Sequence, residues 1–338
     1  MLRHGSPTSG RWPLRGFRPY SRAMRPLVQI VSHGPHCLDG VTAAVAVALY
    51  QADRAEVVAR FASNSEVDAV LRAIRPAPGR DNELWITDIS WREAATDAHL
   101  RQLAAGGMRI HWIDHHRTAL ERFAEGSIDV PFADRVLSED HAASRLTYEH
   151  LGRRLETEGR HPAAFRGFAP VVAMADDNDR WLHRIPGSRE LAWVVRALGP
   201  DAYDDFLRLD ESVTYTPRMQ AARDRVGAEI ARSFAVAEAS RVERIVDGVR
   251  LVAAICDGHP SEIADKWGKE TPGSVFALYD AKSLAVSLRR SPDCTVDLSR
   301  LARSLGGGGH AAAAGCELPE VRNALAQVVA DRVGGKLG

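Results

Sequence analysis

Short apolar runs alternate with amphipathic stretches through the first part of the chain, beginning at Leu27. The runs are short and rich in β-branched residues, so they predict buried strands, and the stretches between them predict helices. The predicted strands cover 27–31, 56–62, 83–89 and 109–113, and the predicted helices cover 40–52, 65–74 and 92–105. Strands separated by helices of this length are typical of a parallel α/β sheet with right-handed crossovers.

The rest of the chain predicts a helical region and then a smaller α/β domain. The elements expected there are helices over 140–157, 161–182, 219–240 and 296–305, and strands over 250–256, 274–280 and 283–290. The expected organisation is a parallel-sheet domain over 27–185, a helical connector over 186–242 and a second domain over 243–338. Residues 1–26 are rich in arginine and contain no acidic residue, and we expect them to form a disordered extension outside the fold.

Side chains that can bind metals follow three of the predicted strands. They are His33 and Asp39 after the first strand, Asp88 near the end of the third, after ELWIT, and Asp114, His115 and His116 after the fourth. Ligands collect at the carboxyl ends of strands in an open parallel sheet, so these residues predict a metal site at one sheet edge. Strand alternation predicts that the two adjacent histidines face opposite ways, one towards a metal and the other towards a substrate.

Two further clusters add to this interpretation. Asp176, Asp177 and Asp179 end an apolar helix, where the helix dipole disfavours negative charge. A divalent cation would relieve that repulsion, although a solvated loop would also explain the cluster. The segment Gly306–Gly315, GGGGHAAAAG, allows close approach of the backbone to an anion, and its alanine-rich part is expected to begin a helix that faces the same anion.

Composition narrows the range of partners. Basic and acidic residues are equal at 44 each, which argues against binding to long duplex DNA or to an anionic membrane surface. No apolar run approaches the length of a membrane span. The four cysteines form no CxxC pair, which favours a reducing cytoplasm. Composition does not determine the oligomeric state, and a dimer is one of the possibilities.

Carboxylates and imidazoles together indicate hard divalent ions such as Mn²⁺ or Mg²⁺. Two such ions sharing a carboxylate can activate a water for attack at phosphorus. The glycine-rich segment and His310, with Arg289 or Arg290, would hold a phosphate or carboxylate group on the other side of a cleft. The sequence thus predicts metal-assisted phosphoester hydrolysis between two domains.

The chain also resembles a known family, the DHH phosphoesterases with a C-terminal DHHA1 domain. The resemblance rests on five motifs in the family's order: SHGPHCLDG (32–40), WITDIS (85–90), IDHH (113–116), DDNDRW (176–181) and GGGGHAAAAG (306–315). Its members include RecJ-type exonucleases, oligoribonucleases that degrade very short RNAs and the nucleotide pAp, and cyclic dinucleotide phosphodiesterases. The resemblance implies a catalytic DHH domain, a substrate-binding DHHA1 domain and two manganese ions, with Fe²⁺, Co²⁺ or Mg²⁺ as alternatives.

The implied activity is hydrolysis of short single-stranded oligonucleotides or small nucleotides. A cyclic dinucleotide phosphodiesterase and a pAp phosphatase are alternatives within the same class. A nucleotide-binding regulatory protein with weak catalysis is an alternative of another class.

Residue roles follow from the same resemblance. One ion would be held by His33 and Asp88, and the other by Asp39, Asp88, His115 and either Asp179, which we favour, or Asp177. Asp114 would orient its neighbours and His116 would face the scissile phosphate. The substrate would be bound by Arg289, Gly307, Gly308, Gly309 and His310.

One position departs from the family pattern. Many members have an aspartate where this chain has Cys37. A cysteine ligand would bias the site towards Fe²⁺ or Zn²⁺, or would weaken the binding of the first ion. Alternatively, Cys37 only packs, and water completes the coordination of that ion.

Overall fold

A computed structural model describes residues 25–337 of the chain. The predicted extension therefore lies almost entirely outside the described residues. Two compact units make up the chain: the first runs to Leu182 and includes Phe206–Ser212, and the second comprises His183–Asp205 and the chain from Val213 onward. Much of the segment predicted to be a connector thus belongs to the second unit. Among the described residues, no helix combines the length and apolar character that crossing a membrane requires.

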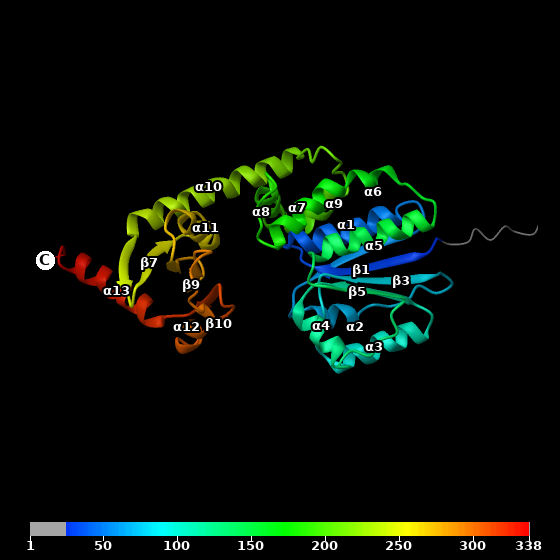
Figure 1. The fold of residues 1–338 in the computed structure, drawn as a ribbon, viewed down its shortest axis with the longest axis horizontal. Coiled ribbons are helices and arrows are strands. Elements are labelled where there is room, and N and C mark those ends of the chain that lie inside the picture. Colours follow the sequence, from blue (N-terminus) through cyan, green and yellow to red (C-terminus); the bar gives the residue numbers. More distant parts are fainter. Residues whose placement is uncertain (1–24, 338) are drawn as a thin grey trace, which may run out of the picture. The chain divides into compact units, whose positions relative to one another are not determined.

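The first unit contains a five-stranded parallel sheet in the order β2-β1-β3-β4-β5 (Figure 1). Its strands are β1 Leu27–His33, β2 Glu56–Ala62, β3 Asn82–Thr87, β4 Arg109–Asp114 and β5 Asp134–Leu137. The parallel α/β class is confirmed, together with the four predicted strands. The fifth strand is too short and too polar to stand out in the sequence.

Helices cover both faces of this sheet (Figure 1). They are α1 Leu38–Gln51, α2 Val67–Arg72, α3 Ala94–Ala105, α4 Arg117–Ala124, α5 Ala143–Thr157, α6 Ala163–Gly167 and α7 Ala169–Asp179. Every residue of α1 is buried, which explains why this helix is rich in alanine. It begins two residues earlier than predicted, so Asp39 lies in its first turn. A second layer of core side chains, including Trp91 and Trp112, packs beneath α2 and α3.

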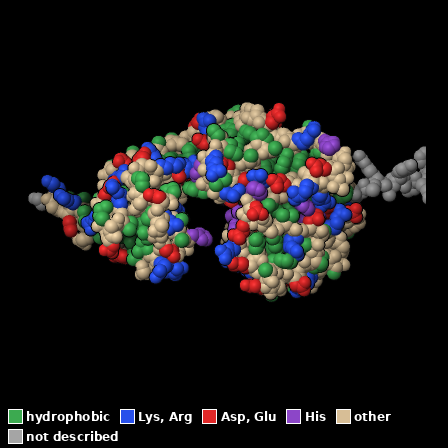
Figure 2. All heavy atoms as spheres, in the orientation of Figure 1, with side chains coloured by type: hydrophobic (Ala, Val, Ile, Leu, Met, Phe, Trp, Pro, Cys, Tyr) green, Lys and Arg blue, Asp and Glu red, His purple; other side chains and the backbone are tan. Residues whose placement is uncertain are grey.

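The second unit is helical at first and then forms a mixed sheet. Its helices are α8 Ser188–Leu198, a 3₁₀ turn at Gly199–Asp201, α9 Ala202–Phe206, which ends at the boundary with the first unit, α10 Pro217–Ser240, α11 Pro260–Glu270, α12 Leu298–Ser304 and α13 Pro319–Gly334. Its strands are β6 Val242–Val246, β7 Val249–Cys256, β8 Ser274–Asp280, β9 Ala285–Arg290, β10 Gly308–Gly309 and β11 Ala313–Cys316. They lie in the order β10-β11-β9-β8-β7-β6, and only β7 and β8 pair in parallel. Acidic and basic side chains are interspersed on the face shown in Figure 2.

The prediction of a helix after His310 is wrong, because the alanine-rich run forms strand β11. This strand pairs with β9 on one side and with the glycines of β10 on the other. A Cβ at Gly307 would lie 2.1 Å from the carbonyl oxygen of Gly315, and a Cβ at Gly309 would lie 2.5 Å from Cα of Ala314. The small residues therefore serve a tight hairpin, and this packing overrides the helix propensity of alanine.

Candidate metal centre

Asp88 lies at the centre of the site, directly after β3. Its φ of 58° is a left-handed conformation that residues other than glycine rarely adopt. The backbone N–H of Asp88 donates to the carbonyl of Ile113 at 3.0 Å, which fixes the turn against β4. The residue is only 2% exposed, so the chain buries a carboxylate at an unfavourable backbone position. Such outliers persist where the surrounding structure determines them, commonly at functional sites.

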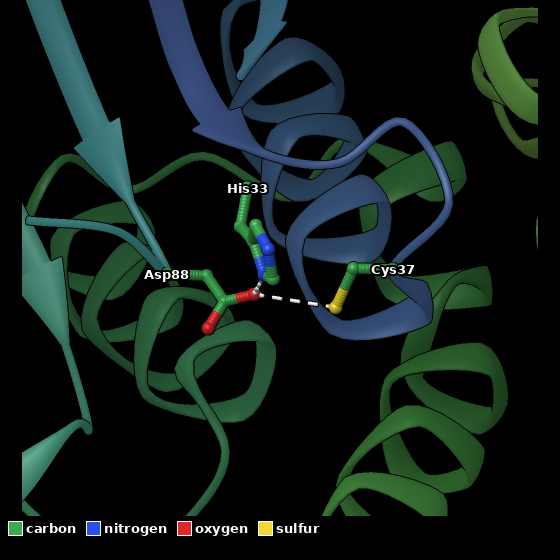
Figure 3. Close-up of side chains that lie close together, drawn as sticks. All are labelled: His33, Cys37 and Asp88. Carbon is green, nitrogen blue, oxygen red and sulfur yellow. Dashed lines mark hydrogen bonds and ion pairs between the residues drawn. The ribbon is translucent and has the colours of Figure 1, made fainter. Parts of the chain in front are cut away.

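The two carboxylate oxygens of Asp88 face two different groups of side chains. Oδ2 lies 3.5 Å from Nδ1 of His33 and 3.5 Å from Sγ of Cys37 (Figure 3). Oδ1 lies 3.3 Å from Nε2 of His115 and 3.9 Å from Nδ1 of His116. Asp88 is therefore common to a group with His33 and Cys37 and to a group with the two histidines.

A third group forms around the same ring nitrogen of His115 that faces Asp88. Its Nε2 lies 3.7 Å from Oδ2 of Asp39 and 3.7 Å from Oδ2 of Asp179. These three residues could hold an ion together. Asp177 is buried but does not join any of the three groups. Of the two rival aspartates, Asp179 is the one that the fold brings to His115.

Asp39 is fixed by the N-terminus of α5. The backbone N–H groups of Ala143 and Ser144 donate to its two carboxylate oxygens, each at 2.8 Å. The carboxylate thus occupies the positive end of a helix, where N–H groups lack partners within the helix. Nearby, Asp176 accepts from the N–H of Ala142 at 2.8 Å. The sequence analysis did not identify α5 as a support of the site. The predicted start of this helix was the one feature that could have indicated it.

Asp114 holds the two histidines in place. Its Oδ1 accepts from the backbone N–H of His115 at 2.7 Å and from that of His116 at 3.0 Å, and it lies 2.7 Å from Nδ1 of His116. The expectation that the two histidines face opposite ways is wrong, because β4 ends at Asp114 and strand alternation no longer applies beyond it. Both rings instead approach Asp88.

Gly40 allows the first turn of α1 to lie against the end of β1. A Cβ at this position would lie 2.1 Å from the carbonyl oxygen of His33 and 3.1 Å from Oδ2 of Asp88. Beneath this contact, the hydroxyl of Ser32 donates to the carbonyl of Gly40 at 2.7 Å and accepts from the hydroxyl of Thr87 at 2.8 Å. The helix start and both strand ends are therefore tied together directly below the site.

The charged groups of the site alter one another's ionisation. Burial, followed by the charge of Asp88, raises the pKa of both Asp39 and Asp179. Burial opposes ionisation of Asp88 too, but hydrogen bonds from His115 and His33 outweigh it and hold the pKa of Asp88 below its ordinary value. For His115, burial disfavours the charged form, yet the hydrogen bond with Asp88 and the neighbouring carboxylates raise the pKa to about 9. Burial and then Asp88 raise the pKa of the Cys37 thiol.

These residues fit a divalent cation. The carboxylates of Asp39, Asp88 and Asp179 all approach His115, and the first two are buried while Asp179 is more exposed. A cation would neutralise charges that otherwise repel one another. Carboxylate oxygens with imidazole nitrogens suit Mn²⁺ and related ions, while the thiol of Cys37 adds a softer donor.

Four of the five substrate-binding residues predicted for the second domain line one pocket of that unit. Its volume is about 540 Å³, and its lining includes Arg289, Gly308, Gly309 and His310. The guanidinium of Arg289 donates to the carbonyls of Leu288 and Ala314 and to the hydroxyl of Ser261. Gly307 does not line the pocket and instead packs against β11.

Comparison with known proteins gives three findings. Residues 250–335 match the DHHA1 domain. Oligoribonuclease NrnB of Bacillus subtilis (strain 168) is 25% identical over 265 residues, and the match covers 76% of this chain and 64% of NrnB. Among solved structures, the pGpG-specific phosphodiesterase PggH from Vibrio cholerae has a TM-score of 0.55 at 12% identity, over 92% of this chain and 99% of that chain. This last likeness shows a shared fold.

Together with the five ordered motifs, these findings support the predicted family. They agree with the DHH/DHHA1 phosphoesterases that the motifs predict, and the DHHA1 match itself covers residues 250–335. The match to NrnB spans less than two thirds of that protein's length.

Proposed function

We propose that the protein is a metal-dependent phosphodiesterase that hydrolyses short single-stranded oligonucleotides, dinucleotides among them. The observation that carries this proposal is the position of Asp88, whose two oxygens face two separate groups of candidate ligands. A carboxylate shared in this way is the bridging ligand that a two-ion site needs. The names of two relatives, an oligoribonuclease and a pGpG-specific phosphodiesterase, support a short substrate.

In this proposal His33 and Asp88 hold one ion, with Cys37 beside it. Asp39, Asp88, His115 and Asp179 hold the other. When bound, the ions would lower the pKa of a water and offset the charge that develops on the phosphoryl oxygens. Mn²⁺ is the proposed native ion, because most of the donors are carboxylates and imidazoles.

His116 is the proposed group that faces the phosphate. Its Nδ1 is held by Asp114, so its Nε2 can donate to an oxygen of the phosphate or of the leaving group. The ring is half-exposed, which would leave room for a substrate. Asp114 would then act by orienting His116 rather than by touching the substrate.

The second unit is proposed to bind the far end of the same substrate, through Arg289, His310 and the glycine hairpin. A short substrate also suits the net charge of zero, because a nuclease that tracks along a long strand would need a basic path. All four cysteines are free thiols, which supports the reducing cytoplasm as the proposed compartment.

The rival of another class is a nucleotide-binding regulatory protein. The observation that favours it is Cys37, which stands where many relatives have an aspartate and which could spoil the first metal site. Turnover discriminates between the two candidates.

The deciding experiment is hydrolysis of a 5′-labelled RNA dinucleotide, a five-nucleotide RNA, pAp and cyclic di-AMP by metal-stripped protein with Mn²⁺ added back. Release of mononucleotides from the dinucleotide is the expected result. Preference for cyclic di-AMP or pAp would move the protein to the alternative substrates of the same class. Binding without turnover in Mn²⁺, Fe²⁺ and Co²⁺ would favour the regulatory protein.

A further inference from the structure

One face of the second sheet is apolar but only partly covered. Along β7, buried and half-buried residues alternate, because Val252, Ala254 and Cys256 face the core beneath α10 and α11. The alternate residues, which include Ala253 and Ile255, face the other way and are apolar as well. A strand with a solvated face normally carries polar residues there, whereas a strand covered on both faces is apolar throughout. The sequence of β7 is therefore typical of a strand whose two faces are both covered.

The uncovered part of this face forms a groove of about 320 Å³. We call it the open sheet face, and the strand side chains that line it are those of Val242, Ala253, Ile255, Ala277, Tyr279 and Val286. The edge strand β6 continues it, with Val242 53% and Val246 50% exposed. Helix α12 packs on the β8, β9 and β11 part of this face, whereas β7 stays half-buried there and β6 is exposed.

Helix α13 carries a matching apolar surface that it does not bury. Val321, Leu325, Val328 and Val329 lie at spacings that place them on one side of the helix, which we call the α13 stripe. They are between 37% and 56% exposed, and no described side chain of α13 is buried. Only the start of the helix touches the groove, through Val321, and the helix then extends away from the sheet (Figure 1). An isolated helix of 16 residues is marginal in water, so α13 needs a partner surface.

We propose that the protein forms a two-fold dimer in which the α13 stripe of each copy packs on the open sheet face of the other. Each copy offers both a helix and a groove, so a reciprocal exchange satisfies both surfaces and closes at two chains. A helix of 16 residues is about 24 Å long, and two such contacts bury roughly 1,000 Å² in total, which reaches the threshold for a specific interface. The dimer is independent of the proposed catalytic function.

The first test measures the mass of the full chain by sedimentation equilibrium from 1 to 50 µM. The wild type is expected at twice the chain mass, and Val328→Glu is expected to raise the dissociation constant at least tenfold, because it places a charge in the apolar contact. Asn323→Glu is the matched control, since it adds the same charge on the opposite side of α13 and should leave the dimer intact. A monomeric wild type, or a dimer that Val328→Glu leaves unchanged, would overturn the proposal.

A second test identifies which sheet the helix covers. Val328→Cys and Ala277→Cys are made as separate proteins, mixed, and treated with a short bismaleimide, with wild type as the background for the native cysteines. Cross-linked pairs that require both variants support exchange between copies. In the double variant, cross-links confined to single chains would instead show that α13 closes on its own sheet, and the proposal would fail.

Discussion

Gly40 and His33 are in direct backbone contact, with room for no side chain between them. A Cβ on Gly40 would lie 2.1 Å from the carbonyl oxygen of His33, which belongs to the backbone and cannot rotate away. Gly40→Ala must therefore push α1 away from β1 and displace His33 relative to Asp88. We expect activity to fall by at least about 100-fold, and overpacking to lower the free energy of unfolding by about 1–3 kcal/mol.

The control is Gly152→Ala, because Gly152 is in helix α5 and a Cβ added there would meet no atom within 4 Å. It should raise helix stability slightly and leave turnover unchanged. Steady-state rates and urea unfolding of both variants measure these changes in activity and stability. Wild-type turnover in Gly40→Ala would mean that the contact at His33 is not needed to position the ligands.

Asp88→Asn should remove most of the activity and most of the bound metal. Asparagine keeps the shape of the side chain but loses the negative charge that faces both ligand groups. We expect a fall in kcat/KM of at least about 100-fold, because both proposed ions lose a ligand. Metal content by plasma mass spectrometry should drop from two ions per chain. Asp53→Asn, at an exposed position, is the control, and equal metal content in the two variants would contradict a shared ligand.

Cys37 decides the metal preference if it is a ligand. Its Sγ lies 3.5 Å from Oδ2 of Asp88 and close to His33. Cys37→Asp would replace a soft donor with a hard one, so activity should shift towards Mn²⁺ and Mg²⁺ and away from Fe²⁺. Cys37→Ser keeps the size of the side chain but removes the thiol, so it separates packing from metal binding. Metal profiles that are identical in all three proteins would show that Cys37 only packs.

His310→Ala should mainly weaken substrate binding. His310 lines the pocket of the second unit with Arg289, and no candidate metal group among the described residues includes it. We expect KM for a dinucleotide to rise about tenfold or more while kcat changes little, since uniform binding is lost. His161→Ala, an exposed histidine of the first unit, serves as the control. A fall in kcat with unchanged KM would instead place His310 in the chemical step.

The sequence predicted β1, β3 and β4 because these strands are almost fully buried and contain apolar runs, whereas the short, polar strand β5 was missed. The rule that ligands gather at the carboxyl ends of parallel strands then placed His33, Asp88 and His115 at one edge. The structure brings these residues together, and their roles as ligands remain predictions for the experiments above.

What the sequence could not supply are contacts between distant segments. Asp39 accepts hydrogen bonds from Ala143 and Ser144, which are more than 100 positions away, and no local sequence pattern predicts these contacts. The alanine run after His310 misled for a similar reason. The residues of this run are small because β10 packs closely against them, and helix propensity, which is a local property, takes no account of that contact.

A last prediction concerns a partly buried polar network away from the site. His111 is stacked on Trp85 at 4.0 Å between ring centroids, and its Nδ1 lies 2.9 Å from Oδ2 of Asp134. The hydrogen bond with His111 outweighs the effect of burial and, with the charges of His150 and Arg154, lowers the pKa of Asp134 to about 2. The unfolded chain binds this proton near pH 4, so the pair stabilises the fold above that pH and loses its effect as the pH falls to about 2.

Asp134→Asn removes this titration. The variant should be less stable than the wild type at pH 7, and the difference between the two proteins should shrink steadily between pH 4 and the lowest pH at which both remain folded. Urea midpoints at pH 7, 4.5, 4, 3.5 and 3, all in EDTA, measure it. Asp53→Asn controls for the loss of a carboxylate without a partner histidine. A difference between wild type and Asp134→Asn that stays constant over this range would show that the pair with His111 carries no pH-dependent stability.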